Sequence, residues 1–326
     1  MRKVLVTGGA GYLGSVLCGK LLDASYSVRC FDRLYFGIGP IQRLIKNKRF
    51  ELVKGNIIDL EQFPGLLENI DAVIHLAGIA NDPAAELDPN LTRLVNYEAS
   101  VKLASLAKSH KIGRFIFASS CSVYGRSFAD TVDENSPINP VSVYAESKAM
   151  AEKEILALAD NHFHPLVLRQ ATLYGFSPRM RFDLAINLMV LDAITKGKIF
   201  IWGGGDQWRP FLHVEDAAEA ILSCLTAPKE KVSGKIYNLG STRDNYKIID
   251  LANLTKNAIR DTILDVIPDN PDKRSYCVNC ERITEELKWQ PKRKIIVSIK
   301  ELSVFIRSKR PQEFKRASYY NIQTMQ

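Results

Sequence analysis

A glycine-rich stretch at residues 7–14, Thr7-Gly8-Gly9-Ala10-Gly11-Tyr12-Leu13-Gly14, constrains the fold more than any other feature of this sequence. It joins a strand-like apolar run at 4–6 to a segment at 11–24 whose apolar residues recur at helical spacing. Glycines at 8, 11 and 14 allow a tight turn and a close approach of the backbone to a pyrophosphate. The N-terminus of the helix adds free N–H groups and a positive dipole end. The stretch therefore predicts a strand–turn–helix unit that binds a dinucleotide.

A carboxylate at the end of the second predicted strand, 27–32, supports this interpretation. Asp32 follows Gly14 at about the spacing expected for a carboxylate that binds the ribose hydroxyls of the dinucleotide. A negative charge there repels a 2′-phosphate, so we expect NAD rather than NADP. The adjacent Arg33 is the feature that favours a phosphate.

The first half of the chain alternates β-rich runs with longer helical patterns, which predicts a parallel sheet wrapped in helices. Further strands are expected at 50–53, 72–76, 114–118 and 165–169, and further helices at 95–110 and 143–159. Gly and Pro interrupt the second half more often, and its elements are shorter. We expect an α/β protein with a Rossmann-type doubly wound parallel sheet and a smaller C-terminal substrate-binding lobe. The NAD-binding domain is placed at 1–174, with return segments near 211–240, and the lobe mainly at 175–326.

Composition excludes several other classes of protein. No run of about 18 uncharged apolar residues is present, and the N-terminus lacks the long apolar stretch of a signal peptide, so a cytoplasmic protein is expected. The net charge is +8, but Lys and Arg are spread thinly and no nucleic-acid-binding signature stands out. Neither nucleic acid nor a membrane is therefore an expected partner.

The six cysteines are scattered, as expected for reduced thiols in the cytosol. Cys277 and Cys280 form a CxxC, but no second pair or clustered His accompanies it. Because a tetrahedral zinc site needs four ligands, no metal site is predicted.

A second group of polar residues indicates proton transfer. Tyr144 and Lys148 lie four positions apart on a predicted helix, so their side chains meet on one face. A phenol has a pKa near ~10, and a nearby ammonium favours the phenolate. Such a tyrosine can exchange a proton with a sugar hydroxyl while hydride leaves or returns at the same carbon. A serine after the fifth strand, Ser119 or Ser120, could hold the same oxygen by a hydrogen bond.

These motifs together resemble the extended short-chain dehydrogenase/reductase family, and within it the NAD-dependent nucleotide-sugar epimerase/dehydratase group. The resemblance covers roughly residues 1–305 and includes TGGAGYLG, His75-Leu76-Ala77-Gly78, SSCSVYG at 119–125 and YAESK at 144–148. It implies that Ser120 rather than Ser119 acts with Tyr144 and Lys148, and that Asp59 contacts the adenine. The residues expected to bind the cofactor are Gly8, Gly11, Tyr12, Leu13, Gly14, Asp32, Arg33, Asn56, Ile58, Asp59, Leu76, Ala77, Gly78, Tyr144 and Lys148.

The same resemblance places Asn187, Arg209 and Arg274 where the family grips the pyrophosphate of its nucleotide-sugar substrate. The role suits the residue types, because Arg offers a bidentate fork to phosphate oxygens and Asn adds a neutral donor. Ser120 would also contact the sugar.

Departures from the family pattern bear on the reaction. Sugar dehydratases have an Asp-Glu pair directly after the catalytic hydroxyl residue, whereas this chain has Cys121 and Ser122, which argues against dehydration. The family's usual Asn after the sixth strand is Thr172 here, which leaves the sugar open. Ser-Ser-Cys also resembles GDP-fucose synthase, where the Cys is an acid/base. Cys121 is thus either a catalytic residue or a buried, inert thiol.

These features favour an NAD-dependent nucleotide-sugar epimerase, similar to UDP-glucose 4-epimerase, in which Tyr144 is the acid/base. A ketoreductase or combined epimerase/reductase with exchangeable NAD(P)H would use the same residues. A non-catalytic NAD-binding sensor is a third alternative, against which the intact Ser120, Tyr144 and Lys148 argue. The resemblance also implies a homodimer formed through the helices at about 95–110 and 143–159.

Overall fold

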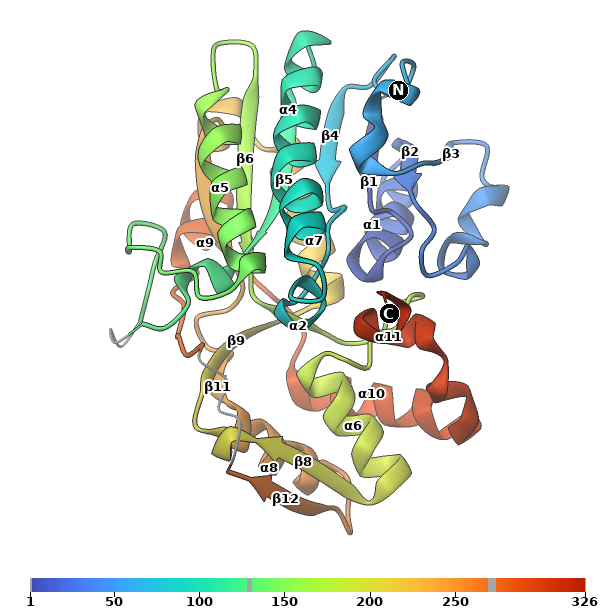
Figure 1. The fold of residues 1–326 in the computed structure, drawn as a ribbon, viewed down its shortest axis with the longest axis vertical. Coiled ribbons are helices and arrows are strands. Elements are labelled where there is room, and N and C mark those ends of the chain that lie inside the picture. Colours follow the sequence, from blue (N-terminus) through green and yellow to red (C-terminus); the bar gives the residue numbers. More distant parts are fainter. Residues whose placement is uncertain (1, 128–130, 269–273, 326) are drawn as a thin grey trace.

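The computed structural model describes residues 2–127, 131–268 and 274–325, and its largest element is a seven-stranded sheet (Figure 1). All six strand pairs are parallel, in the order β10-β6-β5-β4-β1-β2-β3. The strands are β1 (Lys3–Thr7), β2 (Ser27–Asp32), β3 (Phe50–Lys54), β4 (Ala72–His75), β5 (Arg114–Ser120), β6 (His164–Gln170) and β10 (Lys235–Leu239). The direction of winding reverses between β1 and β4, which is where parallel sheets of this kind bind nucleotides. The predicted α/β fold is confirmed.

Helices cover both faces of the sheet, so its strands are apolar along most of their length. Helix α1 (Tyr12–Asp23) and helix α7 (Val214–Thr226) pack together on one face. Helix α4 (Ala99–Ser109) and helix α5 (Val143–Ala157) cover the other (Figure 1). Each face thus has its own apolar core. The central runs Val4–Val6 and Phe115–Phe117 of β1 and β5 are at most 1% exposed.

The helix predicted at 95–110 begins earlier in the structure and is not uniform. It opens as α3 (Pro89–Arg93), where the Asp88 side chain accepts a hydrogen bond from the Leu91 N–H. A π-helical turn, Leu94–Glu98, then leads directly into α4. Because a π turn holds an extra residue, it shifts the apolar repeat, and this hides the early start from a search for one constant period.

The chain crosses into a second lobe after β6 and returns through β9 (Trp208–His213) to α7 and β10. Strand β9 also pairs with β7 (Thr172–Tyr174) and β11 (Asn245–Lys247), and this small sheet joins the two parts. The lobe has its own core, built by α6 (Ala185–Lys196), β8 (Lys198–Trp202), α8 (Ile248–Ala258), β12 (Ile263–Ile267) and α10 (Ile295–Arg307).

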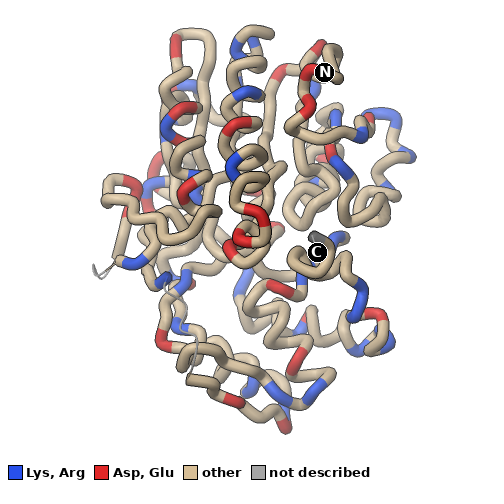
Figure 2. Tube along the Cα trace, in the orientation of Figure 1, with Lys and Arg blue, Asp and Glu red and all other residues tan. Residues whose placement is uncertain are grey.

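The C-terminal segment does not stay in the lobe. After α10 it turns back, and α11 (Asn321–Met325) lies where the lobe meets the sheet domain, close to α2 (Asp82–Ala85) (Figure 1). Charged residues of both signs are interspersed over both parts (Figure 2). None of the helices in the described ranges has the length and apolarity needed to span a bilayer.

Candidate active site

One cleft of about 1010 Å³ runs between the carboxyl edge of the sheet and the lobe. Its walls include the glycine-rich turn, the ends of β4 and β5, the first turns of α5, and lobe residues from β8 and β9. The cleft therefore lies at the edge where the topology of the sheet predicts a ligand.

The glycine-rich turn fits a dinucleotide because its backbone is closely packed and its helix end is left open. Gly8 has φ +72°, and a methyl group built there would lie 2.7 Å from the Ala77 nitrogen. A methyl group on Gly14 would collide with the Gly8 carbonyl oxygen. Helix α1 has Gly11 as its N-cap, which offers no side chain to bind the first N–H groups. These groups and the helix dipole suit a pyrophosphate.

Asp32 lines the cleft beside this turn and is tied to it. Its carboxylate accepts hydrogen bonds from the Ala10 N–H at 2.9 Å and the Leu34 N–H at 2.7 Å. Burial raises the pKa of Asp32, and these two bonds oppose the shift. The Arg33 guanidinium lies over the Tyr35 ring, 4.9 Å from its centre. Asp32 thus both positions the turn and places a carboxylate in the cleft.

Replacing Asp32 with Asn should shift cofactor preference from NAD towards NADP. The amide keeps the size of the side chain and one acceptor, but removes the charge that repels a 2′-phosphate. We expect the ratio of the NAD and NADP dissociation constants to change about tenfold or more, an effect of about 1.4 kcal/mol. Titration with both dinucleotides measures this ratio, and an unchanged ratio would exclude the role of Asp32 in selection.

The other predicted cofactor residues divide into two groups. Asn56, Leu76, Ala77 and Gly78 line the cleft, whereas Ile58 and Asp59 are not part of its lining. Sequence reasoning missed Asn96, whose side chain accepts from the Ile79 N–H at 2.8 Å and donates to the Ile79 carbonyl at 3.0 Å. A single buried amide thus fixes the loop that follows β4.

The structure brings Ser120, Tyr144 and Lys148 together in the cleft, at the end of β5 and on the first two turns of α5. Burial and the Asp82 carboxylate raise the pKa of Tyr144 to about 12, whereas a hydrogen bond with Ser120 lowers it. Burial also lowers the pKa of Lys148 to about 8, and its ammonium donates to the Ala118 carbonyl at 2.9 Å. In the protein by itself, desolvation therefore outweighs the expected effect of the ammonium on the phenol.

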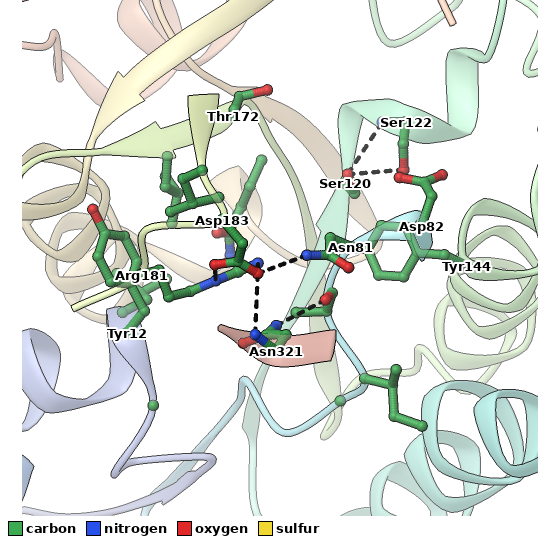
Figure 3. Close-up of a pocket in the computed structure, with 18 of the residues that line it drawn as sticks. Tyr12, Asn81, Asp82, Ser120, Ser122, Tyr144, Thr172, Arg181, Asp183 and Asn321 are labelled. Atoms are coloured by element: carbon green, nitrogen blue, oxygen red, sulfur yellow. Dashed lines mark hydrogen bonds and ion pairs between the residues drawn. The ribbon is translucent and has the colours of Figure 1, made fainter. Parts of the chain in front are cut away.

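Ser122, which the sequence identified only as a departure from the dehydratase pattern, orients the Ser120 hydroxyl. The Ser120 oxygen accepts hydrogen bonds from the Ser122 N–H at 3.1 Å and from the Ser122 hydroxyl at 2.9 Å (Figure 3). With both lone pairs engaged, Ser120 is left to donate its own proton. That proton can go to the Tyr144 oxygen or to a substrate oxygen beside it.

Ser122→Ala removes one of these two bonds and frees the Ser120 hydroxyl to rotate. We expect kcat to fall about 3- to 10-fold with little change in KM, because a typical neutral hydrogen bond contributes about 1 kcal/mol. Steady-state kinetics measures both constants. Ser109→Ala, at the exposed end of α4 and outside the cleft lining, is the matched control, and equal effects of the two variants would contradict the role of Ser122.

Cys121 and Asn187 are turned away from the cleft. Cys121 is 1% exposed, and its thiol donates to the Arg169 carbonyl at 3.1 Å. Burial raises the pKa of that thiol, which favours the inert alternative. The fully buried Asn187 donates to the Tyr12 hydroxyl at 3.1 Å and accepts from the Gly175 N–H at 3.0 Å. Neither side chain is part of the cleft lining.

Arg209 and Arg274 both line the cleft and meet on its lobe side. Arg209 donates to the Arg274 carbonyl at 2.6 Å, and its guanidinium lies 5.3 Å from the centre of the Tyr276 ring. The Arg274 guanidinium pairs with Asp82 of α2, beside Tyr144. Figure 3 shows Asp82 and Tyr144 on the same side of the cleft as Ser120. Two arginines thus line the cleft on the lobe side, and Arg274 lies near Tyr144.

Comparison with known proteins agrees with this geometry. The profile of the NAD dependent epimerase/dehydratase family matches residues 4–240. The uncharacterized UDP-glucose epimerase YtcB of Bacillus subtilis (strain 168) is 32% identical over 73% of this chain and 76% of its own length. The dTDP-D-glucose 4,6-dehydratase of Homo sapiens is 29% identical over 89% of this chain and 86% of its own.

Among solved structures, the UDP-glucuronic acid 4-epimerase from Bacillus cereus, in complex with UDP-glucuronic acid and NAD, superposes with a TM-score of 0.82. It is 25% identical, and the match covers 94% of this chain and 99% of that one. The similarity thus spans the sheet domain and the lobe together.

Proposed function

Because this chain belongs to the NAD-dependent epimerase/dehydratase family, we propose that it is a nucleotide-sugar epimerase that inverts carbon 4 of the sugar. The proposal rests on which side chains near Ser120 can act as an acid or base. Tyr144 can move a proton there, while Cys121 is buried and Ser122 is a neutral hydroxyl bonded to Ser120. In the family pattern, an enzyme that eliminates water has additional acid/base residues at the positions of Cys121 and Ser122. Epimerisation needs only the tyrosine as acid/base.

Bound NAD would supply the hydride acceptor that later becomes the hydride donor, so that the reaction consumes no cofactor. The turn from Gly8 to Gly14 and Asp32 are the residues that would hold it. The protein's own contribution is proton transfer. Once ionised, Tyr144 would accept the proton of the sugar hydroxyl, while Ser120 donates a hydrogen bond to the same oxygen. Burial disfavours the phenolate in the protein alone, and the positive charge of Lys148, one helical turn away, would oppose this effect.

Arg209 and Arg274 would bind the diphosphate of the substrate, which leaves the sugar beside Tyr144. Arg274 is paired with Asp82 in the protein alone, so a diphosphate would take the place of that carboxylate as its partner. Because the diphosphate would anchor the substrate, the oxidised sugar could rotate and present its other face without leaving the cleft. After this rotation Tyr144 returns the proton, and the configuration at the carbon is inverted.

The decisive experiment identifies the nucleotide released when the purified protein is denatured. Stoichiometric NAD, together with interconversion of UDP-glucose and UDP-galactose or of the corresponding uronic acids without net NADH, would support the epimerase. An empty site that accepts added NADH or NADPH and reduces a keto-sugar would replace it with the ketoreductase. Release of a 4-keto-6-deoxy sugar would show a dehydratase instead.

We also propose that two copies pair through α4 and α5, as the family resemblance implies. Apolar side chains are exposed on α5 and on the π-helical turn that leads into α4. They include Met150, which is 43% exposed, and Leu94, which is 36% exposed. Pairing of two copies would cover this surface. A monomeric mass in solution at micromolar concentration would exclude the dimer.

A further inference from the structure

Arg179 is a buried cation in the wall of the cleft whose guanidinium is only partly satisfied. The residue is 4% exposed and lines the cleft. Its Nη2 donates to the Asn321 side-chain oxygen at 2.7 Å, whereas its Nε finds no hydrogen-bond partner among the described residues. A buried donor without a partner costs free energy, and a buried charge without a counterion costs more.

Asp183 is the carboxylate whose charge acts on Arg179, but Arg181 already forms an ion pair with it. Arg181 binds Asp183 through two hydrogen bonds, at 3.0 Å and 2.9 Å, and both side chains are nearly buried. Asp183 also accepts hydrogen bonds from Asn81 and from the Asn321 N–H (Figure 3). The described part of the chain shows no ion pair that includes Arg179, so two arginines share one carboxylate. The resulting local excess of positive charge is what an anionic ligand would relieve.

The neighbours of Arg179 indicate which anion this is. Ser177, two residues earlier, donates to the carbonyl of Tyr12 at 2.6 Å and bonds the Ser15 hydroxyl, so this segment is fixed to the first turn of α1. The Arg179 guanidinium lies over the ring of Phe36, 3.7 Å from its centre, in the loop that follows Asp32. Arg179 therefore stands between the open end of α1 and the Asp32 loop, away from Arg209 and Arg274 in β9 and the lobe.

We propose that Arg179 is an anion-binding residue of the cofactor site and contacts the pyrophosphate of the dinucleotide from the lobe side. The glycine-rich turn would bind the same phosphates from the sheet side through neutral N–H groups. The pyrophosphate would then be held between a helix end and a guanidinium. This inference rests on the binding of a dinucleotide and is independent of the reaction that the enzyme catalyses.

The C-terminal segment positions this arginine. Asn321 is 4% exposed and, besides accepting from Arg179, donates its amide to the Ala80 carbonyl at 2.9 Å. The rings of Phe314 and Tyr319 pack on Phe182, with centres 5.3 Å and 5.4 Å away, and hold the segment against the lobe. Asn321 thus ties Arg179 to the loop after β4, and Arg179, Asn321 and Ala80 all line the cleft.

The test compares ligands that share the adenosine part and differ in phosphate. Arg179→Met keeps the packing on Phe36 and removes the charge. We expect the affinities for NAD and ADP-ribose to fall about 10- to 100-fold, as for the loss of a hydrogen bond to a charged group, while adenosine binds as before. The melting temperature without ligand should not fall, because the buried charge has gone. Arg307→Met, on the exposed face of α10, is the control and should change none of these values.

Three outcomes would overturn the proposal. ADP-ribose affinity within twofold of the original would show that Arg179 does not bind the pyrophosphate. An equal loss for adenosine, with a lower melting temperature, would show a structural role. A selective loss of uridine diphosphate affinity would assign Arg179 to the substrate instead. None of these readouts requires turnover, so failure here is distinguishable from failure of the epimerase proposal.

A double-mutant cycle tests the positioning role of Asn321. Asn321→Ala should weaken ADP-ribose binding less than Arg179→Met, and the double variant should bind ADP-ribose as weakly as Arg179→Met alone. A purely structural role would instead make the two losses additive, and that result would remove Asn321 from the proposal.

Discussion

Replacing Tyr144 with Phe is expected to lower kcat by about 10³-fold, within the 10²- to 10⁴-fold range of general acid–base catalysis. The phenol is the group beside Ser120 that can exchange a proton with the sugar hydroxyl, and Phe keeps the ring but not this oxygen. KM and the dissociation constant of NAD should change little, because the diphosphate and dinucleotide contacts are made by other residues. Steady-state kinetics and a cofactor titration provide these values.

The variant also separates chemistry from folding. Burial raises the pKa of Tyr144 to about 12, so the hydroxyl is neutral in the protein alone, and removing it deletes no buried charge. The melting temperature should therefore stay within a few degrees of the original. Tyr26→Phe, a half-buried tyrosine outside the cleft, is the matched control and should retain full activity. A Tyr144→Phe enzyme within tenfold of the original kcat would remove the tyrosine from the mechanism.

Features set by short sequence spacing could be predicted from the sequence. The turn from Gly8 to Gly14 needs only a strand, three glycines and a helix, all within neighbouring residues. Tyr144 and Lys148 meet because they are one helical turn apart. The α/β fold followed from the alternation of strand and helix patterns, since each pattern is periodic by itself. In each case the interaction is encoded within one or two adjacent elements.

Features that depend on contacts between distant segments could not be predicted. Asn321 lies 2.7 Å from Arg179 although 142 residues separate them, and neither shows a motif. Arg274 pairs with Asp82 across 192 residues. The resemblance placed Asn187 on the substrate, but the structure directs its amide to the Tyr12 hydroxyl instead. Sequence patterns report which chemistry is present, whereas the partner of a buried polar group is decided by tertiary packing.

The largest expected loss of stability lies beneath the site, at the ion pair of Arg169 and Glu152. The two side chains are 5% and 3% exposed, their charges are 2.8 Å apart, and Ser119 donates to the same carboxylate. Arg169 also donates to the Tyr124 hydroxyl at 3.1 Å. This network joins β5, β6 and α5, the elements that carry Ser120 and Tyr144. Because both charges are buried, removing either partner should lower the free energy of unfolding substantially.

Arg169→Met should reduce the free energy of unfolding by about 3–5 kcal/mol, because it leaves the Glu152 carboxylate buried without its cation. Adding Glu152→Leu should restore much of that loss, since a buried apolar pair replaces the buried charge. Chemical denaturation of the three proteins measures these values. Lys198→Met breaks a surface pair with Asp265, whose side chains are 46% and 42% exposed, and should change stability by less than about 1 kcal/mol.

The double variant decides whether the ion pair serves stability or the site. If stability returns but kcat stays low, the charges beneath β5 position Ser120 and Lys148 and are not needed for folding. If both stability and kcat recover, an apolar pair can replace the ion pair without loss of folding or activity. An Arg169→Met variant as stable as the original would instead contradict the contribution of this ion pair to folding.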